Sequence, residues 1–250
     1  SRRINDFVYG KFRDTFFNRF THIHCPSNMI ANQLREHGYT AQLHVISNGI
    51  SPEYAYGKRS KEEWMEGFFN ILMVGRYAGE KRQDVLIEAA AKCCHAREIQ
   101  VILPGKGPLE KKYRRLAEKL PNPVIMGFYE PARLIEILHM ADLYVHTSDA
   151  EIEAMSCMEA FACGLVPVIA DSPRSATPQF ALDERSLFPA GDSDTLAERI
   201  DWWIERPKER QEMERRYAKH AEQYKLERSI EQTEEMFRQA IHEQGKKTEV

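Results

Sequence analysis

EIEAMSCMEAFACGLVPVIA, residues 151–170, is the stretch of this chain that decides its fold. Small residues at helical spacing stop at Gly164, and an apolar run follows at once, which indicates a helix that leads into a buried strand. Glu151 falls in the loop before this helix, and Glu159 about two turns inside it. In a doubly wound parallel sheet, such loops and helix starts lie at the carboxyl edge of the strands, where ligands bind. The stretch therefore predicts an α/β fold with two carboxylates near a binding site.

The alternation of helix and strand extends to both sides of this stretch, from about residue 68. Short apolar runs typical of buried strands alternate with helical segments. We expect strands at 69–74, 99–104, 123–126, 142–146, 165–170 and 186–188, and helices at 82–94, 108–119, 130–139, 155–163 and from 194. Such alternation predicts parallel βαβ units, and hence a Rossmann-like parallel sheet flanked by helices with its strand-end loops on one edge.

The chain divides into three segments on this pattern. Residues 58–225 make the Rossmann-like domain, and residues 226–250 read as a C-terminal helix and tail. Residues 1–57 form a separate segment before the Rossmann-like domain, which ends in a linker. The elements expected in that segment are a helix at 4–20, a strand near 22–25, a helix at 28–37 and a strand at 43–46.

Composition excludes several classes of protein. A formal net charge of −3 argues against a general nucleic-acid binder, which is usually strongly basic. No apolar run approaches the about 20 residues needed to span a bilayer, and the start SRRINDFVYG lacks the apolar core of a secretory signal. The five cysteines form no CxxC pair, which is typical of reduced thiols. We therefore expect a cytoplasmic protein without a nucleic-acid partner.

Two features near the start of the chain each allow two interpretations. The run His22-Ile-His24-Cys25 suits a metal site or a short strand, and we favour the strand because no second ligand cluster follows. The helix at 4–20 carries a stripe of apolar residues together with Arg2, Arg3, Lys11, Arg13 and Arg19. A packed stripe beneath a solvated face is the favoured interpretation of that helix, and peripheral contact with a membrane surface is the alternative.

The first strand of the regular domain ends in the segment GRYAGEKR, residues 75–82. Gly75 allows the chain to turn sharply and brings its backbone near a ligand. Arg76 and Lys81 would both stand at the carboxyl edge, where a guanidinium and an ammonium bind phosphate oxygens. Such contacts also stabilise a departing diphosphate. The alternative is that both are surface cations at a helix start.

Three weaker signals lie at the same predicted edge. Gly105 and Gly107, after the second strand, suit a nucleotide or a tight turn, but the segment lacks the third glycine of a dinucleotide fingerprint. Phe128, after the third strand, suits either the face of a flat base or core packing. The helix start near Ser156 offers free N–H groups to a phosphate.

The two glutamates suit a sugar nucleotide. A carboxylate accepts hydrogen bonds from the two vicinal hydroxyls of a ribose, and Glu159, inward on its helix, is placed for that contact. Glu151, in the loop before the helix, is nearer to a sugar beyond the diphosphate. Two solvated acids in an acidic loop are the alternative interpretation.

Taken together, these motifs resemble those of the family-4 retaining glycosyltransferases. ISNGI at 46–50, GRYAGEKRQDVLIEAA at 75–90, GKGP at 105–108 and the pair Glu151 and Glu159 occur in the order and spacing of that family. The resemblance covers about residues 20–225. It implies the two-lobed GT-B architecture, in which one Rossmann-like lobe holds the nucleotide sugar and the other the acceptor.

The resemblance also implies roles for particular residues. Arg76 and Lys81 look like the pair that grips the diphosphate, Glu159 like the ribose ligand, and Glu151 like the acid that contacts the donor sugar. The expected catalytic residues are thus Glu151, Arg76 and Lys81, without metal or other cofactor. The expected donor is a UDP-sugar, with a GDP-sugar as the alternative.

The chain departs from the family pattern in two places. Ile152, Glu153 and Ala154 replace the usual glycines after the first glutamate, and residues 171–180 lack a common double glycine. Both variants are similar to a subgroup that glucosylates or galactosylates diacylglycerol-type lipids. This similarity implies a lipid acceptor, with a saccharide as the alternative, and work at the inner face of the membrane.

The resemblance implies that residues 1–57 are a remnant of the N-terminal acceptor domain followed by a linker, because they are short for an acceptor lobe of this family. We therefore expect a complete donor lobe and a truncated acceptor lobe, so that the chain binds nucleotide but transfers sugar poorly. Two other functions stay open: a non-catalytic nucleotide-sugar-binding module of the same fold, and a nucleotide-sugar epimerase.

Overall fold

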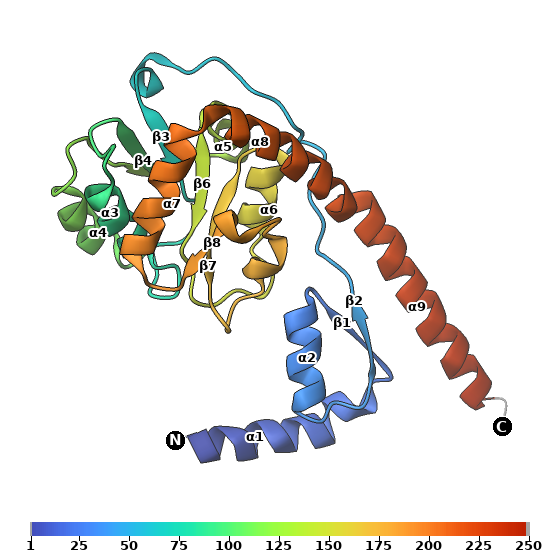
Figure 1. Ribbon diagram of the computed structural model, residues 1–250. Coiled ribbons are helices and arrows are strands. Elements are labelled where there is room, and N and C mark those ends of the chain that lie inside the picture. Colours follow the sequence, from blue (N-terminus) through green and yellow to red (C-terminus); the bar gives the residue numbers. More distant parts are fainter. Residues whose placement is uncertain (1, 249–250) are drawn as a thin grey trace. The chain divides into compact units, whose positions relative to one another are not determined.

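The computed structural model describes residues 2–248 of the chain and the side chains of residues 8–244. The chain forms two compact units, which divide between residues 49 and 50 and again between residues 225 and 226. Residues 50–225 make the larger unit, and the residues before and after it make the smaller one (Figure 1). The assignment of the first residues to a remnant of a second domain stays a prediction.

A parallel sheet of six strands forms the centre of the larger unit (Figure 1). Its strands stand in the order β5-β4-β3-β6-β7-β8, and each neighbouring pair is parallel. The strands are β3 (Phe69–Leu72), β4 (Ile99–Pro104), β5 (Ile125–Gly127), β6 (Leu143–His146), β7 (Pro167–Asp171) and β8 (Leu187–Pro189). Each strand lies within two residues of its predicted place at either end. The predicted Rossmann-like parallel sheet is confirmed.

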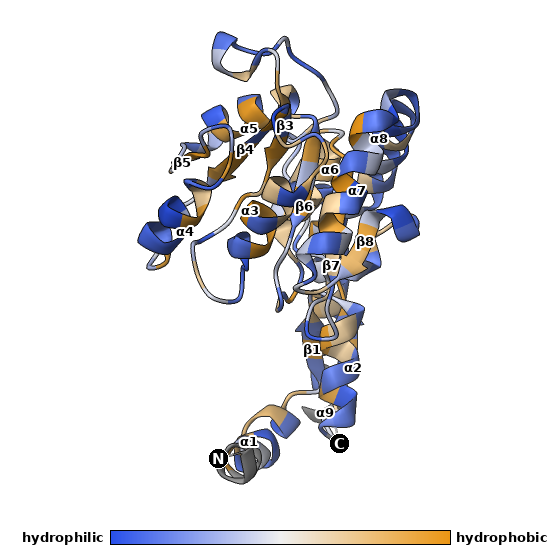
Figure 2. Cartoon of the chain, turned by 60° about the vertical axis from the view of Figure 1, so that its left-hand side comes forward, coloured by the Kyte–Doolittle hydropathy of each residue, from blue (hydrophilic) through white to orange (hydrophobic). Residues whose placement is uncertain are grey.

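Helices cover both faces of this sheet (Figure 1). On one face α3 packs against α4 and α7, and on the other α6 packs against α8. Right-handed crossovers place α5 with α6. The helices are α3 (Gln83–Lys92), α4 (Glu110–Ala117), α5 (Pro131–Met140), α6 (Met155–Ala162), α7 (Ser193–Glu205) and α8 (Pro207–Ala221). Figure 2 shows hydrophobic colour on strand β4 and on the flanking helix α5, and hydrophilic colour on much of α4.

The order in which the chain adds strands to the sheet reverses at the boundary between β3 and β6. Strands β4 and β5 lie on one side of β3, whereas β6, β7 and β8 lie on the other. The loops after β3 and β6 therefore lead to helices on opposite faces, which opens a crevice at the carboxyl edge between them. This crevice receives both segments in which the sequence placed the phosphate-binding cations and the first glutamate.

An aromatic cluster fixes α6 in place behind that crevice. Phe161 is fully buried, and its ring lies 5.6 Å from Phe180, 5.9 Å from Tyr217 and 6.1 Å from Tyr224 between ring centroids. These partners come from the turn after β7, from α8 and from the turn after α8. The cluster thus holds α6 against the elements that follow it in the chain.

The smaller unit contains a parallel pair of strands with helices around it. Its elements are α1 (Arg2–Thr15), β1 (His22–Cys25), α2 (Asn28–Glu36), β2 (Gln42–Val45) and α9 (Leu226–Thr248). The run His22–Cys25 is a strand, as we interpreted it, and His22 Nδ1 lies 2.8 Å from His44 Nε2 on the neighbouring strand. The apolar stripe of α1 is exposed in this structure, at 58% for Phe12, so the favoured expectation of a packed stripe is wrong for the described residues.

We expect Phe161→Ala to lower the free energy of unfolding of the larger unit by about 3–5 kcal/mol, because it removes a buried ring and leaves a cavity behind α6. Urea titration followed by tryptophan fluorescence measures this, since Trp64, Trp202 and Trp203 all lie in that unit. Phe128→Ala is the matched control: its ring is 60% exposed, so we expect a change within about 0.5 kcal/mol. A loss below about 1 kcal/mol in Phe161→Ala would contradict the proposed anchoring of α6.

Candidate active site

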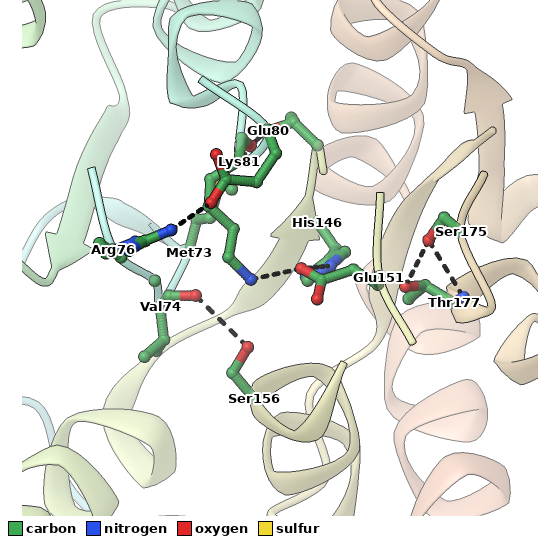
Figure 3. A network of polar contacts seen from close by, with 12 residues as sticks. Met73, Val74, Arg76, Glu80, Lys81, His146, Glu151, Ser156, Ser175 and Thr177 are labelled. Carbon is green, nitrogen blue, oxygen red and sulfur yellow. Dashed lines mark hydrogen bonds and ion pairs between the residues drawn. The ribbon is translucent and has the colours of Figure 1, made fainter. Parts of the chain in front are cut away.

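The loop after β3 holds the two predicted phosphate-binding cations in different surroundings (Figure 3). The side chain of Arg76 is 68% exposed and forms a surface ion pair with Glu80, at 2.7 Å between Nη2 and Oε1. Such an exposed pair contributes little free energy, so the guanidinium remains available to an anion. Lys81 is only 20% exposed, and its ammonium forms an ion pair with Oε1 of Glu151. The structure thus joins two predicted site residues that lie 70 positions apart in the sequence.

Glu151 is a buried carboxylate with two basic partners. Its side chain is 12% exposed, and its Oε1 lies 3.2 Å from His146 Nε2 in addition to the contact with Lys81 (Figure 3). Burial raises the pKa of Glu151, but the neighbouring imidazole of His146 and then the ammonium of Lys81 outweigh it and lower the pKa to about 2. Glu151 therefore carries a negative charge at neutral pH.

His146 is a member of this site that sequence reasoning missed. It is the last residue of β6, is fully buried, and its ring stacks on Tyr144 with 6.2 Å between centroids. By its sequence the run DLYVH at 142–146 predicts only a strand. A polar residue at the carboxyl end of a buried strand was the available signal, because that end is where ligands bind in such sheets.

The start of α6 adjoins the end of β3. The hydroxyl of Ser156 donates to the carbonyl of Val74 at 3.3 Å and accepts from the hydroxyl of buried Tyr144 at 3.0 Å. The first N–H groups of a helix have no acceptor within it and, with the helix dipole, favour an anion. The predicted anion-binding helix start therefore lies at the crevice, beside the β3 loop that carries Arg76 and Lys81.

Ala154, just before α6, keeps a backbone conformation that favours glycine. Its φ of 61° and ψ of 61° are left-handed, although it occupies one of the positions where glycines are usual in the family that the chain resembles. A non-glycine residue in this conformation costs roughly 1–2 kcal/mol, so the surrounding loop holds it there. The turn needed before α6 is therefore preserved without glycine.

Glu159 lies nearer to the helix start than predicted. It is the fifth residue of α6, about one turn from its beginning rather than two, although the helix begins at the predicted residue, Met155. Its carboxylate is half-buried; burial raises its pKa, and a hydrogen bond with Tyr54 works against that rise. In the part of the chain that the structure describes, it forms no ion pair with the other predicted site residues.

The glycines after β4 bring two strand-end loops together. A Cβ on Gly105 would lie 2.0 Å from the carbonyl oxygen of Gly75, and a Cβ on Gly107 would lie 2.6 Å from that of Tyr77. The N–H of Gly105 is already used, since it donates to Gly127 at 2.7 Å. Close packing of the loops thus explains both glycines, and a direct contact with a ligand stays a prediction.

A pocket of about 360 Å³ lies at this meeting of the loops. Gly75, Arg76, Gly105 and Phe128 line it, so four predicted binding residues share one cavity. The ring of Phe128 is 60% exposed, with Lys106 Nζ 4.7 Å from its centroid. A concave, mostly apolar pocket with an exposed ring suits a flat heterocycle.

Two structural features are absent from the described residues. No group of three or more histidine, cysteine or acidic side chains is arranged to hold a metal ion there. No helix in the described part of the chain combines the length and the apolar character that crossing a membrane requires.

Comparison with known proteins gives a family match over most of the chain. Residues 57–224 match the model of the glycosyl transferases group 1. The GDP-mannose-dependent alpha-mannosyltransferase of Corynebacterium glutamicum is 32% identical over 164 residues, which are 64% of this chain and 37% of that protein. The alpha-monoglucosyldiacylglycerol synthase of Streptococcus pneumoniae is 25% identical over 160 residues, which are 58% of this chain and 36% of that protein.

A solved structure is more similar in sequence. The crystal structure of the catalytic domain of cholesterol-alpha-glucosyltransferase from Helicobacter pylori is 51% identical, with a TM-score of 0.61. The match covers 62% of this chain and 98% of that chain. The chain spans little more than a third of the length of the two curated relatives.

Replacing Glu151 by Gln tests the charge at the centre of this site. The pKa of about 2 in the folded state lies below the ordinary 4.5, so Glu151 stabilises the fold above about pH 4.5 and loses this contribution as the pH falls toward 2. We expect Glu151→Gln to lower the free energy of unfolding at pH 7 by up to about 3 kcal/mol, and the deficit to shrink below pH 4.

Urea titrations of the parent and the variant from pH 7 to pH 3 measure this deficit. Glu80→Gln is the control, because its exposed pair with Arg76 predicts a change of less than about 1 kcal/mol. A deficit for Glu151→Gln that is the same at pH 3 as at pH 7 would show that Glu151 is not held as a charged group.

Proposed function

The chain belongs to the glycosyl transferases group 1, and on this premise we propose that the protein transfers a hexose from a nucleoside-diphosphate sugar to a lipid. The single observation that supports this most is the meeting of Lys81 and Glu151 at the crevice between β3 and β6. A cation for a diphosphate and a carboxylate for sugar hydroxyls are the two groups that such a donor needs side by side.

We propose that the donor lies along the carboxyl edge of the sheet. The base occupies the pocket beside Phe128, and the ribose reaches Glu159. The diphosphate meets Arg76, Lys81 and the start of α6, which supply positive charge from protein groups without a metal ion. The sugar then extends to Glu151. UDP is the expected nucleotide and GDP the alternative.

The proposed reaction begins with departure of the nucleoside diphosphate. Negative charge grows on the leaving phosphate as its bond to the sugar breaks, and cations fixed beforehand stabilise that charge in the transition state. The acceptor hydroxyl attacks from the face that the phosphate leaves and gives its proton to that phosphate. The sugar therefore keeps its anomeric configuration.

Two observations support a lipid as acceptor. The names of two similar proteins specify cholesterol and monoglucosyldiacylglycerol. Next to Glu151, the side chain of Ile152 is 60% exposed, which gives this end of the site an apolar surface where the family usually has glycine. A lipid acceptor places the reaction at a membrane surface, and we propose the cytoplasmic face.

The exposed side of α1 supports contact with a membrane. Tyr9 and Phe12 on α1 and Phe16 directly after it are between 50% and 69% exposed, and Lys11 and Arg13 lie among them in the sequence. Aromatic and basic side chains on one helix suit the interface of an anionic bilayer. Vesicle flotation distinguishes this contact from packing of the same face against further protein.

Calorimetric titration with UDP and with GDP tests the donor site. We expect one of the two to bind the parent chain, and Lys81→Ala to weaken that binding about 10- to 100-fold, the effect of a charge-assisted hydrogen bond. Glu159→Ala should weaken it about tenfold by removing the proposed ribose contact. Lys92→Ala is the control, because Lys92 pairs with Ser193 and Asp194 on α7, and it should bind as the parent does.

Failure of both nucleotides to bind at millimolar concentration would contradict the proposed donor site. Nucleotide binding that is unchanged in both Lys81→Ala and Glu159→Ala would also contradict the proposed donor site. Preference between UDP and GDP identifies the base.

Incubation with radiolabelled UDP-glucose and vesicles of anionic phospholipid tests the acceptor. Cholesterol or diacylglycerol is added to separate vesicle samples. We expect label in the lipid extract, and less of it with Lys81→Ala because the leaving diphosphate loses a cation. Vesicle flotation measures membrane binding in the same samples.

Three other outcomes exclude the lipid transferase. Label that appears only as free glucose indicates hydrolysis without an acceptor. An isomerised donor indicates an epimerase. Nucleotide binding without turnover on any acceptor indicates a non-catalytic module.

A further inference from the structure

Both basic partners of Glu151 contact the same oxygen. Lys81 Nζ and His146 Nε2 both lie at Oε1, and within the described residues no hydrogen bond reaches Oε2. Figure 3 shows Oε2 on the side away from these two contacts. One oxygen of the carboxylate is thus anchored, and the other is available to a sugar hydroxyl.

Lys81 cannot serve Glu151 and a diphosphate equally well. A diphosphate carries more negative charge than the carboxylate, and the proposed donor places it within the reach of this lysine. When Lys81 turns toward the diphosphate, Glu151 loses a partner while it stays buried. An uncompensated buried charge is strongly destabilising, so a second partner decides whether Glu151 remains ionised.

His146 is fixed where such a second partner is required. Its side chain is 1% exposed at the end of a central strand, and its stacking on Tyr144 restricts the ring. Among the described residues neither ring nitrogen forms a hydrogen bond of good geometry, and the contact of Nε2 with Oε1 of Glu151 at 3.2 Å is its one ion-pair contact. His146 therefore stays beside Oε1 whether or not Lys81 does.

The other titratable groups around Glu151 do not replace His146. Tyr144 on β6 and Cys157 on α6 also lie close enough to Glu151 for an electrostatic interaction. Burial raises the pKa of the Tyr144 hydroxyl and the Cys157 thiol well above their ordinary values, so both stay neutral. Lys81 and His146 are thus the two basic side chains in contact with the carboxylate of Glu151.

We propose that Lys81 exchanges Glu151 for the diphosphate when the donor binds, and that His146 is the positioning residue that then holds Glu151, still charged, for the donor sugar. The proposal rests on the proposed function, since it requires a nucleoside diphosphate in the crevice. On this proposal Glu151 and the diphosphate of the donor compete for Lys81.

A double-mutant cycle with UDP as ligand tests this exchange, with GDP in its place if only GDP binds. Glu151→Gln removes the competitor, so we expect it to bind UDP about three- to tenfold more tightly than the parent. His146→Phe keeps the ring on Tyr144 and removes the polar contact, so we expect it to bind UDP at least tenfold more weakly. In the Glu151→Gln background, His146→Phe should change UDP affinity less than twofold, because the charged carboxylate that His146 holds is no longer present.

Proton uptake distinguishes positioning from a merely structural role. In His146→Phe the bound state leaves Glu151 without its remaining partner, so Glu151 takes up a proton when UDP binds. Titrations in two buffers of different ionisation enthalpy should give close to one proton taken up, against close to none for the parent. His146→Gln, which restores a donor near Nε2, should return both the affinity and the proton count toward the parent. His95→Phe, at an exposed pair with Glu98, is the control.

Each failure has a separate meaning. A parent chain that binds neither UDP nor GDP overturns the proposed function. A parent that binds, with Glu151→Gln no tighter or with His146→Phe equally damaging in both backgrounds, overturns the exchange alone. If His146→Phe does not fold, the UDP affinity of Glu151→Gln still tests the exchange of Lys81 between Glu151 and the diphosphate.

Discussion

The parallel pairing of β3 with β6 is the contact on which the site depends, because it brings two loops far apart in the sequence to one edge. Ile71 pairs with Leu143 and Leu72 with Tyr144, and the chain reverses its strand order between these two strands. The loop after β3 leads to one face of the sheet and the loop after β6 to the other. The crevice between them is the place where a polar ligand reaches both loops and the start of a helix.

The charged side chains in this crevice form ion pairs whose partners a bound ligand can replace. Arg76 pairs with Glu80 in solvent, whereas Lys81 pairs with Glu151 in a largely buried position. Water screens the first pair, so it opens at little cost. The second pair exchanges partners only if the carboxylate keeps another one. His146 supplies that partner, and we see in this arrangement a reason why a strand inside the core ends on a histidine.

Much of the fold could be predicted from the sequence because its signals are local. Apolar runs bounded by turns placed each strand of the sheet within two residues at either end. Strand ends in a parallel sheet share one edge, so Arg76, Lys81 and Glu151 could be assigned to a common site. The exposure of the apolar stripe on α1 could not be predicted, since periodicity shows that a helix has an apolar face but not what covers that face.

The sequence by itself determined the fold class, the family and the edge of the sheet where the site lies, because repeating hydrophobic patterns and short motifs carry that information. Only the tertiary structure decided which charged side chains form ion pairs with one another. Lys81 and Glu151 are 70 residues apart, and strand register sets their contact. The left-handed turn at Ala154 was hidden for a related reason: alanine does not favour it, and the surrounding loop imposes it. His146 became a site residue only when folding buried it against Glu151.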